Sequence, residues 1–216
     1  MYQIILGKIS ELSKYSLPAE LRQQAPGGLR CNSWLAGRAL LSLIFYPDSL
    51  PVIFNDQNGK PHFHDDMSLW FNISHSDDDI VLLLSDEGEV GCDIEAIRPR
   101  KNWLRLANAV FSEGEHKEIE EKPEKNQLAE FWRIWTLKEA IVKQRSDAVC
   151  QIASIDSTQP GQLFLSHCQL ATFSLAVCTL TPFTPNTVIK FCLSKSPCVH
   201  YSFVPLFTNI VSSRLL

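Results

Sequence analysis

The chain has 216 residues, with 24 acidic and 20 basic side chains, a formal net charge of −4 and 45% hydrophobic residues. This length suits one medium domain or two small fused halves, and the composition is too apolar and too weakly charged for a disordered protein. Mild acidity argues against a nucleic-acid partner, and no apolar run approaches the ~20 residues that a membrane helix needs.

Residues 1–8 have neither the charged stretch nor the long apolar run of a signal peptide. The seven cysteines are scattered and include no C-x-x-C pair. Together these features predict a cytoplasmic protein with reduced thiols and no membrane contact. The spacing of apolar residues then predicts a helix over 29–44, followed by a turn at 55–60 that is rich in Asn, Asp and Gly.

The middle of the chain carries its clearest strand pattern. Three strands are predicted at 70–74, 80–84 and 89–95. Residues 101–144 are predicted to be mainly helical, with a break near Lys122-Pro123, and short strands are expected at 162–166 and 173–177. All 24 acids lie before residue 157, so chemistry that needs carboxylates must lie there too. Residues 187–216 are apolar but irregular, and either an extra strand pair or a poorly packed tail fits them.

The strand at 89–95 places two acids on one face. Successive side chains of a strand point to opposite sides, so Val90, Cys92 and Ile94 share one face while Asp93 and Glu95 share the other. Two carboxylates so close together repel each other unless a cation lies between them, and Mg²⁺ prefers oxygen ligands of this kind. A solvent-exposed polar face is the alternative interpretation.

A second acid stands out in the helix predicted near 128–143. The apolar stripe of this helix includes Trp132, Trp135 and Val142, and Glu139 falls on the same stripe. A buried carboxylate needs a partner, and Lys143, one turn further on, could supply a simple surface-type ion pair. If Asp93, Glu95 and Glu139 instead share one cation, with Lys143 beside it, the set suits Mg²⁺-dependent transfer at a pyrophosphate.

Five short motifs carry a family resemblance. They are Gly37-Arg38, Gly59-Lys60-Pro61, Phe71-Asn72-Ile73-Ser74-His75-Ser76, Val90-Gly91-Cys92-Asp93-Ile94-Glu95 and Trp135-Thr136-Leu137-Lys138-Glu139-Ala140-Ile141-Val142-Lys143. In these motifs and their order the chain resembles the 4′-phosphopantetheinyl transferases of the longer, Sfp-type group. The likeness spans roughly residues 30–145 and does not reach the segment after 186.

The resemblance implies an α+β fold of two similar halves related by a pseudo-twofold axis, with the active site in the cleft between them. The N-terminal half would comprise residues 1–86 and the C-terminal half residues 87–186, leaving 187–216 as a tail of unknown structure. The implied reaction moves 4′-phosphopantetheine from coenzyme A to a serine of an acyl carrier protein or carrier domain, which points to fatty acid biosynthesis. The enzyme would act as a monomer.

The resemblance also implies a role for each site residue. The implied Mg²⁺ ligands are Asp93, Glu95 and Glu139. Glu139 would also be the base for the serine hydroxyl, and Lys143 would neutralise the pyrophosphate. Implied contacts to the 3′-phosphate and nucleotide of coenzyme A come from Arg38, Lys60, Ser74 and His75.

Two other classes of function use the same residues. A module that binds carrier protein or coenzyme A with little activity would have no need of three metal ligands. A metal-dependent hydrolase of nucleotide pyrophosphates would use water as the nucleophile and need no protein substrate. One departure from the family is the loop Asp77-Asp78-Asp79, whose charge we expect to weaken coenzyme A binding if it lies near the phosphate pocket.

Overall fold

The computed structural model describes residues 1–170, 172–182, 188–192, 199–200 and 208–210. Within these ranges the fold is a mixture of helix and sheet, as expected. A five-stranded sheet has the order β10-β9-β1-β5-β4, a four-stranded sheet the order β11-β7-β8-β6, and β2 pairs with β3 in a small ribbon. The strands of the first sheet are β1 (Tyr2–Lys8), β4 (Trp70–Ser76), β5 (Asp79–Ser85), β9 (Val188–Cys192) and β10 (Val199–His200). The others are β2 (Phe54–Asn55), β3 (Pro61–His62), β6 (Gly91–Ala96), β7 (Phe164–Leu170), β8 (Phe173–Thr179) and β11 (Thr208–Ile210).

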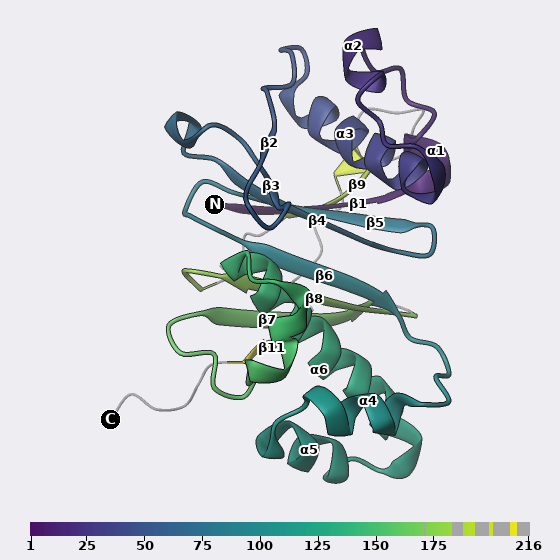
Figure 1. The fold of residues 1–216 in the computed structure, drawn as a ribbon, viewed down its shortest axis with the longest axis vertical. Coiled ribbons are helices and arrows are strands. Elements are labelled where there is room, and N and C mark those ends of the chain that lie inside the picture. The colour runs from purple at the N-terminus through teal and green to yellow at the C-terminus, as the bar shows by residue number, and fades with distance from the viewer. Residues whose placement is uncertain (171, 183–187, 193–198, 201–207, 211–216) are drawn as a thin grey trace.

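Helices cover the outer faces of the two main sheets, which face each other in the middle of the molecule (Figure 1). On the outer side of the first sheet lie α1 (Ile9–Leu12), α2 (Ala19–Arg22) and α3 (Cys31–Phe45). On the outer side of the second lie α4 (Trp103–Val110), α5 (Glu113–Glu120) and α6 (Glu124–Arg145), with α6 next to the sheet. Short 3₁₀ turns are η1 (Gly28–Arg30), η2 (Asp65–Met67) and η3 (Val149–Ser154). No helix within the described ranges is both long and apolar enough to cross a bilayer.

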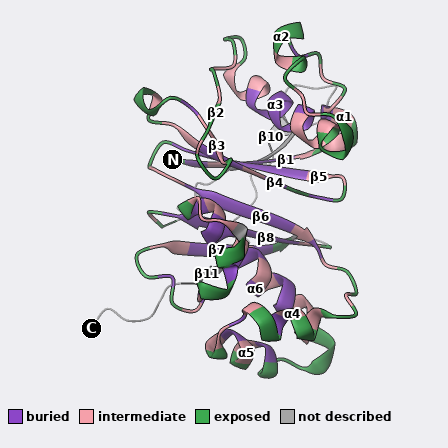
Figure 2. Ribbon diagram, in the orientation of Figure 1, coloured by how far each residue is buried: buried purple, intermediate pink, exposed green. Residues whose placement is uncertain are grey.

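The buried residues concentrate in the sheets and on the helix faces turned toward them (Figure 2). Ile4 and Leu6 of β1 pack with Val90, Cys92 and Ile94 between the two sheets. The opposite face of the first sheet packs under α3, and the opposite face of the second packs under α6. The predicted alternation along residues 89–95 is therefore confirmed, because the apolar set lies in the core between the sheets.

The predicted helical stretch 101–144 is divided into three helices. The expected break is confirmed, since Pro123 directly precedes α6. A second break at Ser112 was not predicted. There the Ser112 hydroxyl accepts from the Glu115 amide, and the Glu115 carboxylate accepts from the Ser112 amide, so α5 begins with a capping box. The pattern Ser112-x-x-Glu115 was visible in the sequence and marks this helix start.

Three strands of each main sheet are paired in the same order and direction. In the first, β1 pairs with β5 and β5 with β4, all antiparallel; in the second, β6 pairs with β8 and β8 with β7, again antiparallel. The described parts of 187–216 extend both sheets: β9 runs parallel to β1, with Gln3 opposite Val188, and β11 pairs with β7. The five cysteines whose side chains the structure describes are free thiols, as expected for that part of the chain.

Candidate active site

The two sheets meet along β4 and β6, which lie side by side and are joined by side chains of β4. The Asn72 side-chain oxygen accepts from the Cys92 amide at 2.9 Å, and the Ser76 hydroxyl accepts from the Ala96 amide at 3.1 Å. These contacts satisfy backbone donors on the free edge of β6, which would otherwise be left unpaired. The edge of β6 that carries the two predicted metal ligands is thus fixed against the first half of the chain.

Two serines of β4 also hold the acids of β6. Ser74 Oγ donates to Asp93 Oδ1 at 2.7 Å, and Ser76 Oγ donates to Glu95 Oε2 at 2.7 Å. A β-strand places alternate residues on one face, so Ser74 and Ser76 present their hydroxyls in the same direction. Ser74, which was expected to contact the nucleotide, is therefore engaged with Asp93 in this structure.

Close approach of α6 to β6 brings Glu139 and Lys143 to the same place. Gly91 makes that approach possible, because a Cβ there would overlap the Ala140 carbonyl oxygen and lie 2.9 Å from Gln144 Cα. Glu139 and Lys143 are one helical turn apart and share a face. Both line a cavity of about 220 Å³, together with Lys60.

Lys143 forms an ion pair at the centre of this arrangement. Its Nζ lies 2.6 Å from Asp93 Oδ1 and 2.9 Å from Ser74 Oγ. Burial alone would lower the pKa of Lys143, but the charge of Asp93 and the hydrogen bond to it prevail, so the pKa is raised and the amine stays protonated. The sequence expectation that Lys143 lies beside the carboxylates is met, with Asp93 rather than Glu139 as its partner.

The carboxylates carry more negative charge than Lys143 balances. Burial raises the pKa of Glu139, and the charges of Asp93 and Glu95 raise it further. Burial and Asp93 likewise raise the pKa of Glu95 against the opposing hydrogen bond from Ser76. Asp93 Oδ2 is buried and has no hydrogen-bond partner among the described residues. A buried carboxylate oxygen without a partner, beside two further carboxylates whose pKa values are raised, is a donor set that suits a hard divalent cation.

The three carboxylates do not surround a common point at which a metal ion would be bound. In the described part of the chain, no three His, Cys, Asp or Glu side chains stand close enough together to hold a metal. The positive charge at Asp93 is that of Lys143. The residue types and their shared electrostatics therefore fit a divalent cation, while the side chains are arranged around an ammonium group.

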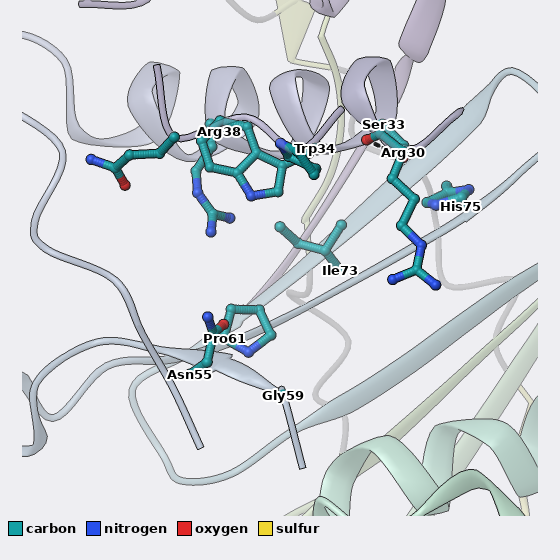
Figure 3. A pocket seen from close by; sticks show the side chains of 12 residues that line it. Arg30, Ser33, Trp34, Arg38, Asn55, Gly59, Pro61, Ile73 and His75 are labelled. Carbon is teal, nitrogen blue, oxygen red and sulfur yellow. Dashed lines mark hydrogen bonds between the residues drawn. The ribbon is translucent and has the colours of Figure 1, made fainter. Parts of the chain in front are cut away.

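A larger cavity of about 550 Å³ adjoins this cluster and lies between α3, the loop at 55–61 and β4. Its lining includes the basic residues Arg30, Arg38 and His75. The two cavities share Gly59, Pro61 and Ile73 in their walls. Figure 3 shows Arg38 of α3 and Arg30 of η1 both reaching into this space. Their common wall makes the two cavities neighbouring parts of one site.

Arg38 is a buried cation without an acidic partner. It is 9% exposed, it stacks 4.6 Å from the centre of the Trp34 ring, and burial lowers its pKa to about 10. No carboxylate among the described residues forms an ion pair with Arg38 or with Arg30. A buried guanidinium without a counter-ion is costly. The cavity is therefore prepared for an anionic ligand, consistent with the expected role of Arg38.

His75 lines the same cavity, as expected from its sequence motif. Loss of hydration and the nearby Lys143 ammonium lower the pKa of His75, while Asp93 acts in the opposite direction. The imidazole is consequently neutral at pH 7 in the protein alone. A bound phosphate would favour its charged form.

Sequence reasoning missed Arg30 and Trp34 as cavity residues. Arg30, Trp34 and Arg38 follow one another at intervals of four residues, which places them on one side of a helical segment. This spacing was available in the sequence, but the isolated Arg38 was considered without its neighbours.

Lys60 is held within the protein. Its ammonium donates to the Glu89 carboxylate, to the Val90 carbonyl at 3.2 Å and to the Gln144 carbonyl at 3.2 Å. These three contacts use all of its protons. Lys60 therefore lies at the expected site, in the wall of the smaller cavity, but it ties the 55–61 loop to β6 and α6 rather than presenting a free cation.

The charge of the acidic loop at 77–79 is partly balanced by its surroundings. Asp79 pairs with Lys8 at 2.7 Å, and Asp77 pairs with Arg98 at 2.9 Å. Asp78 accepts from the Ser10 amide and hydroxyl. Two of the three charges that were expected to weaken coenzyme A binding are therefore paired with basic side chains, and the effect of the loop on binding stays a prediction.

Comparison with known proteins shows to which family this chain is related. A model of the 4′-phosphopantetheinyl transferase superfamily matches residues 89–192, which include β6 and α6. The chain is 62% identical over 192 residues to the 4′-phosphopantetheinyl transferase AcpT of Salmonella typhi, covering 88% of this chain and 99% of that protein. The chain belongs to the 4′-phosphopantetheinyl transferase superfamily.

Further relatives extend the comparison. This transferase is 62% identical over 184 residues to AcpT of Escherichia coli (strain K12), covering 85% of this chain and 93% of that protein. It is 33% identical over 147 residues to the 4′-phosphopantetheinyl transferase psf-1 of Bacillus pumilus, covering 61% of this chain and 62% of that protein. The resemblance found in the motifs is thus confirmed, and the protein is an enzyme of this transferase family.

Proposed function

We propose that this transferase moves the 4′-phosphopantetheine group of coenzyme A to a serine hydroxyl of an acyl carrier protein, with Mg²⁺ in the site. The serine oxygen forms a bond to the β-phosphorus, the pyrophosphate bond breaks, and 3′,5′-ADP leaves. One observation carries the proposal: a cavity with unpaired arginines adjoins a cluster of carboxylates and one lysine. A ligand with a terminal phosphate and a pyrophosphate fits both parts.

The cluster supplies the groups that this reaction needs. Asp93, Glu95 and Glu139 would hold Mg²⁺, which neutralises charge on the pyrophosphate oxygens. Glu139 accepts the proton of the serine hydroxyl, directly or through water. Lys143 offers its charge to the leaving group. Transfer of a phosphoryl-type group depends mainly on such positioning and charge neutralisation, so no nucleophile on the enzyme is needed.

The larger cavity supplies binding. Arg38 and Arg30 would hold the 3′-phosphate of coenzyme A, and His75 would add a third contact once it is protonated. Ser74 and Lys60 would act indirectly, because Ser74 orients Asp93 and Lys60 fixes the loop that forms the common wall of the two cavities.

The same proposal covers the organisation of the molecule. The equal strand paths of the two sheets support two halves, 1–86 and 87–186, related by a pseudo-twofold axis, with the site at their junction. A monomer is sufficient, because both halves come from one chain. We also propose that the enzyme works in the cytoplasm, where coenzyme A and carrier proteins meet.

The reaction is tested by the intact mass of an apo-acyl carrier protein after incubation with this transferase, coenzyme A and Mg²⁺. A gain of about 340 Da, lost when EDTA is added, is expected from phosphopantetheine transfer. Coenzyme A binding with no mass gain on any carrier protein would favour a binding module. Release of 3′,5′-ADP without carrier protein would favour a pyrophosphate hydrolase.

The role of Arg38 gives a selective prediction. Arg38→Ala should raise the KM for coenzyme A by about tenfold or more, because a charge-assisted contact to the 3′-phosphate is lost. The KM for dephospho-coenzyme A, which lacks that phosphate, should change much less. Steady-state rates with both substrates measure this. Arg105→Ala, on the exposed side of α4, is the matched control, and equal effects of Arg38→Ala on both substrates would contradict the assignment.

A further inference from the structure

Lys143 occupies the position of the counter-ion in the carboxylate cluster. Its ammonium contacts Asp93 Oδ1 at 2.6 Å, and it is the only lysine or arginine among the described residues that pairs with Asp93, Glu95 or Glu139. Glu139 accepts no hydrogen bond from any described residue, and Asp93 Oδ2 also has no partner. The cluster is thus arranged around one organic cation.

In this arrangement Lys143 and a divalent cation would compete for Asp93. An ammonium and a divalent cation at the same carboxylate repel each other strongly in a partly buried site. A metal ion that binds Asp93 must therefore displace the Lys143 ammonium. If the ammonium stays, the affinity of Asp93 for the metal is reduced. A displaced lysine needs another anion nearby, since an isolated buried ammonium is costly.

The cavity offers a place for that anion. The Lys143 side chain is 27% exposed and lines the smaller cavity, which shares a wall with the larger basic one. A pyrophosphate bound there would lie on the open side of Lys143. The ammonium could then leave Asp93 for the pyrophosphate through a change in its own side-chain torsions, without movement of α6.

We propose that Lys143 is the resident counter-ion of the carboxylate cluster and that it makes metal and coenzyme A bind cooperatively. This inference rests on the proposed function, because it takes the pyrophosphate of coenzyme A as the second ligand. Metal alone competes with Lys143 for Asp93. Coenzyme A removes the competitor, and by thermodynamic linkage metal then strengthens coenzyme A binding to the same degree.

The test is Mn²⁺ binding, followed by electron paramagnetic resonance, to wild type and Lys143→Met without coenzyme A. The variant should bind Mn²⁺ about tenfold more tightly or better, because it keeps the carboxylates and lacks the competing charge. Arg145→Met is the matched control: it removes one charge from the same helix at an exposed position that pairs with no described carboxylate, and its affinity should stay within about twofold of wild type. Equal affinities of Lys143→Met and wild type would overturn the inference.

Coenzyme A is added in a second series. It should tighten Mn²⁺ binding by a larger factor in wild type than in Lys143→Met, because the variant has no competitor to remove. Equal factors would also overturn the inference. Should Lys143→Met fail to fold, amine labelling of the wild-type protein decides, since Mn²⁺ alone should increase the labelling rate of Lys143 and no increase would contradict its release.

The mass assay on the wild type separates this inference from the proposed function. If the wild type modifies the carrier protein but Lys143→Met binds Mn²⁺ no more tightly, the transferase assignment stands and the counter-ion role is wrong. If the wild type modifies no carrier protein, the proposed function fails whatever the metal affinities are.

Discussion

Glu139→Gln is expected to abolish transfer while leaving the protein at least as stable as the wild type. Loss of the carboxylate removes one proposed metal ligand and the proposed base, and the loss of such a group costs about 10²–10³-fold or more in kcat. The measurement is the rate of mass gain of the carrier protein, paired with thermal melts followed by circular dichroism. A variant with a near-normal rate would refute both roles of Glu139.

The stability half of this prediction follows from the direction of the pKa shift. The pKa of Glu139 is raised in the fold by burial and by its acidic neighbours, so the fold prefers the protonated carboxyl. The ionised carboxylate therefore lowers the free energy of unfolding. This loss is absent at a pH below the pKa in the unfolded chain, which is about 4.3, and is fully present at a pH above the raised pKa in the folded protein. Glutamine removes this cost near pH 7, and the advantage of the variant should shrink as the pH falls.

A control separates this effect from a general effect of removing acid. Glu120→Gln changes an exposed carboxylate of α5 that makes no hydrogen bond to a described residue, and it should alter neither the melting temperature nor the rate. A clear drop in the melting temperature of Glu139→Gln, measured without added metal, would show that the Glu139 carboxylate stabilises the fold, against the pKa argument.

Gly91→Ala is expected to destabilise the fold and to reduce activity together. The added methyl group would overlap the backbone of α6 at Ala140 and Gln144, where no flexible side chain can move away. Overpacking of a core costs about 1–3 kcal/mol, and a clash with backbone lies at the upper end of that range or beyond it. Any relief that moves α6 away from β6 also moves Glu139 and Lys143 away from Asp93.

Urea denaturation and transfer rates measure the two effects. Gly37→Ala is the matched control for stability, because its added Cβ would lie 3.2 Å from the Cδ1 tip of Ile73, which can shift, and a helical position gains from alanine. The Gly37 variant should have near-normal stability. Equal losses in the two variants would mean that contact with α6 is not what requires a glycine at position 91.

Much of the site could be predicted because its residues lie on regular elements. Strand alternation alone placed Asp93 and Glu95 on the face opposite Val90, Cys92 and Ile94, and helical spacing placed Glu139 one turn before Lys143. These periodicities are local, so they survive any arrangement of the sheets. The family resemblance added Arg38 and His75, and both line the cavity.

The engagement of Lys60 and Ser74 could not be predicted, because it depends on contacts between distant parts of the chain. Lys60 meets Glu89 and Gln144, and Ser74 meets Asp93, only after the two sheets have come together. The ion pairs of the acidic loop at 77–79 could not be predicted for the same reason, since Lys8, the partner of Asp79, lies far away in sequence. Only the tertiary structure shows which charges are already used.

The pairing of β1 with β9 has a consequence for how the protein is made. Gln3 lies opposite Val188, so one edge of β1 stays without this partner until residue 188 has been synthesised. At usual rates of translation this interval is roughly 10–40 s. An unpaired strand edge is a site of aggregation during that time. Chains that are cut before residue 188 should therefore be more prone to associate than chains that contain β9, even though residues 1–187 contain every group proposed for catalysis.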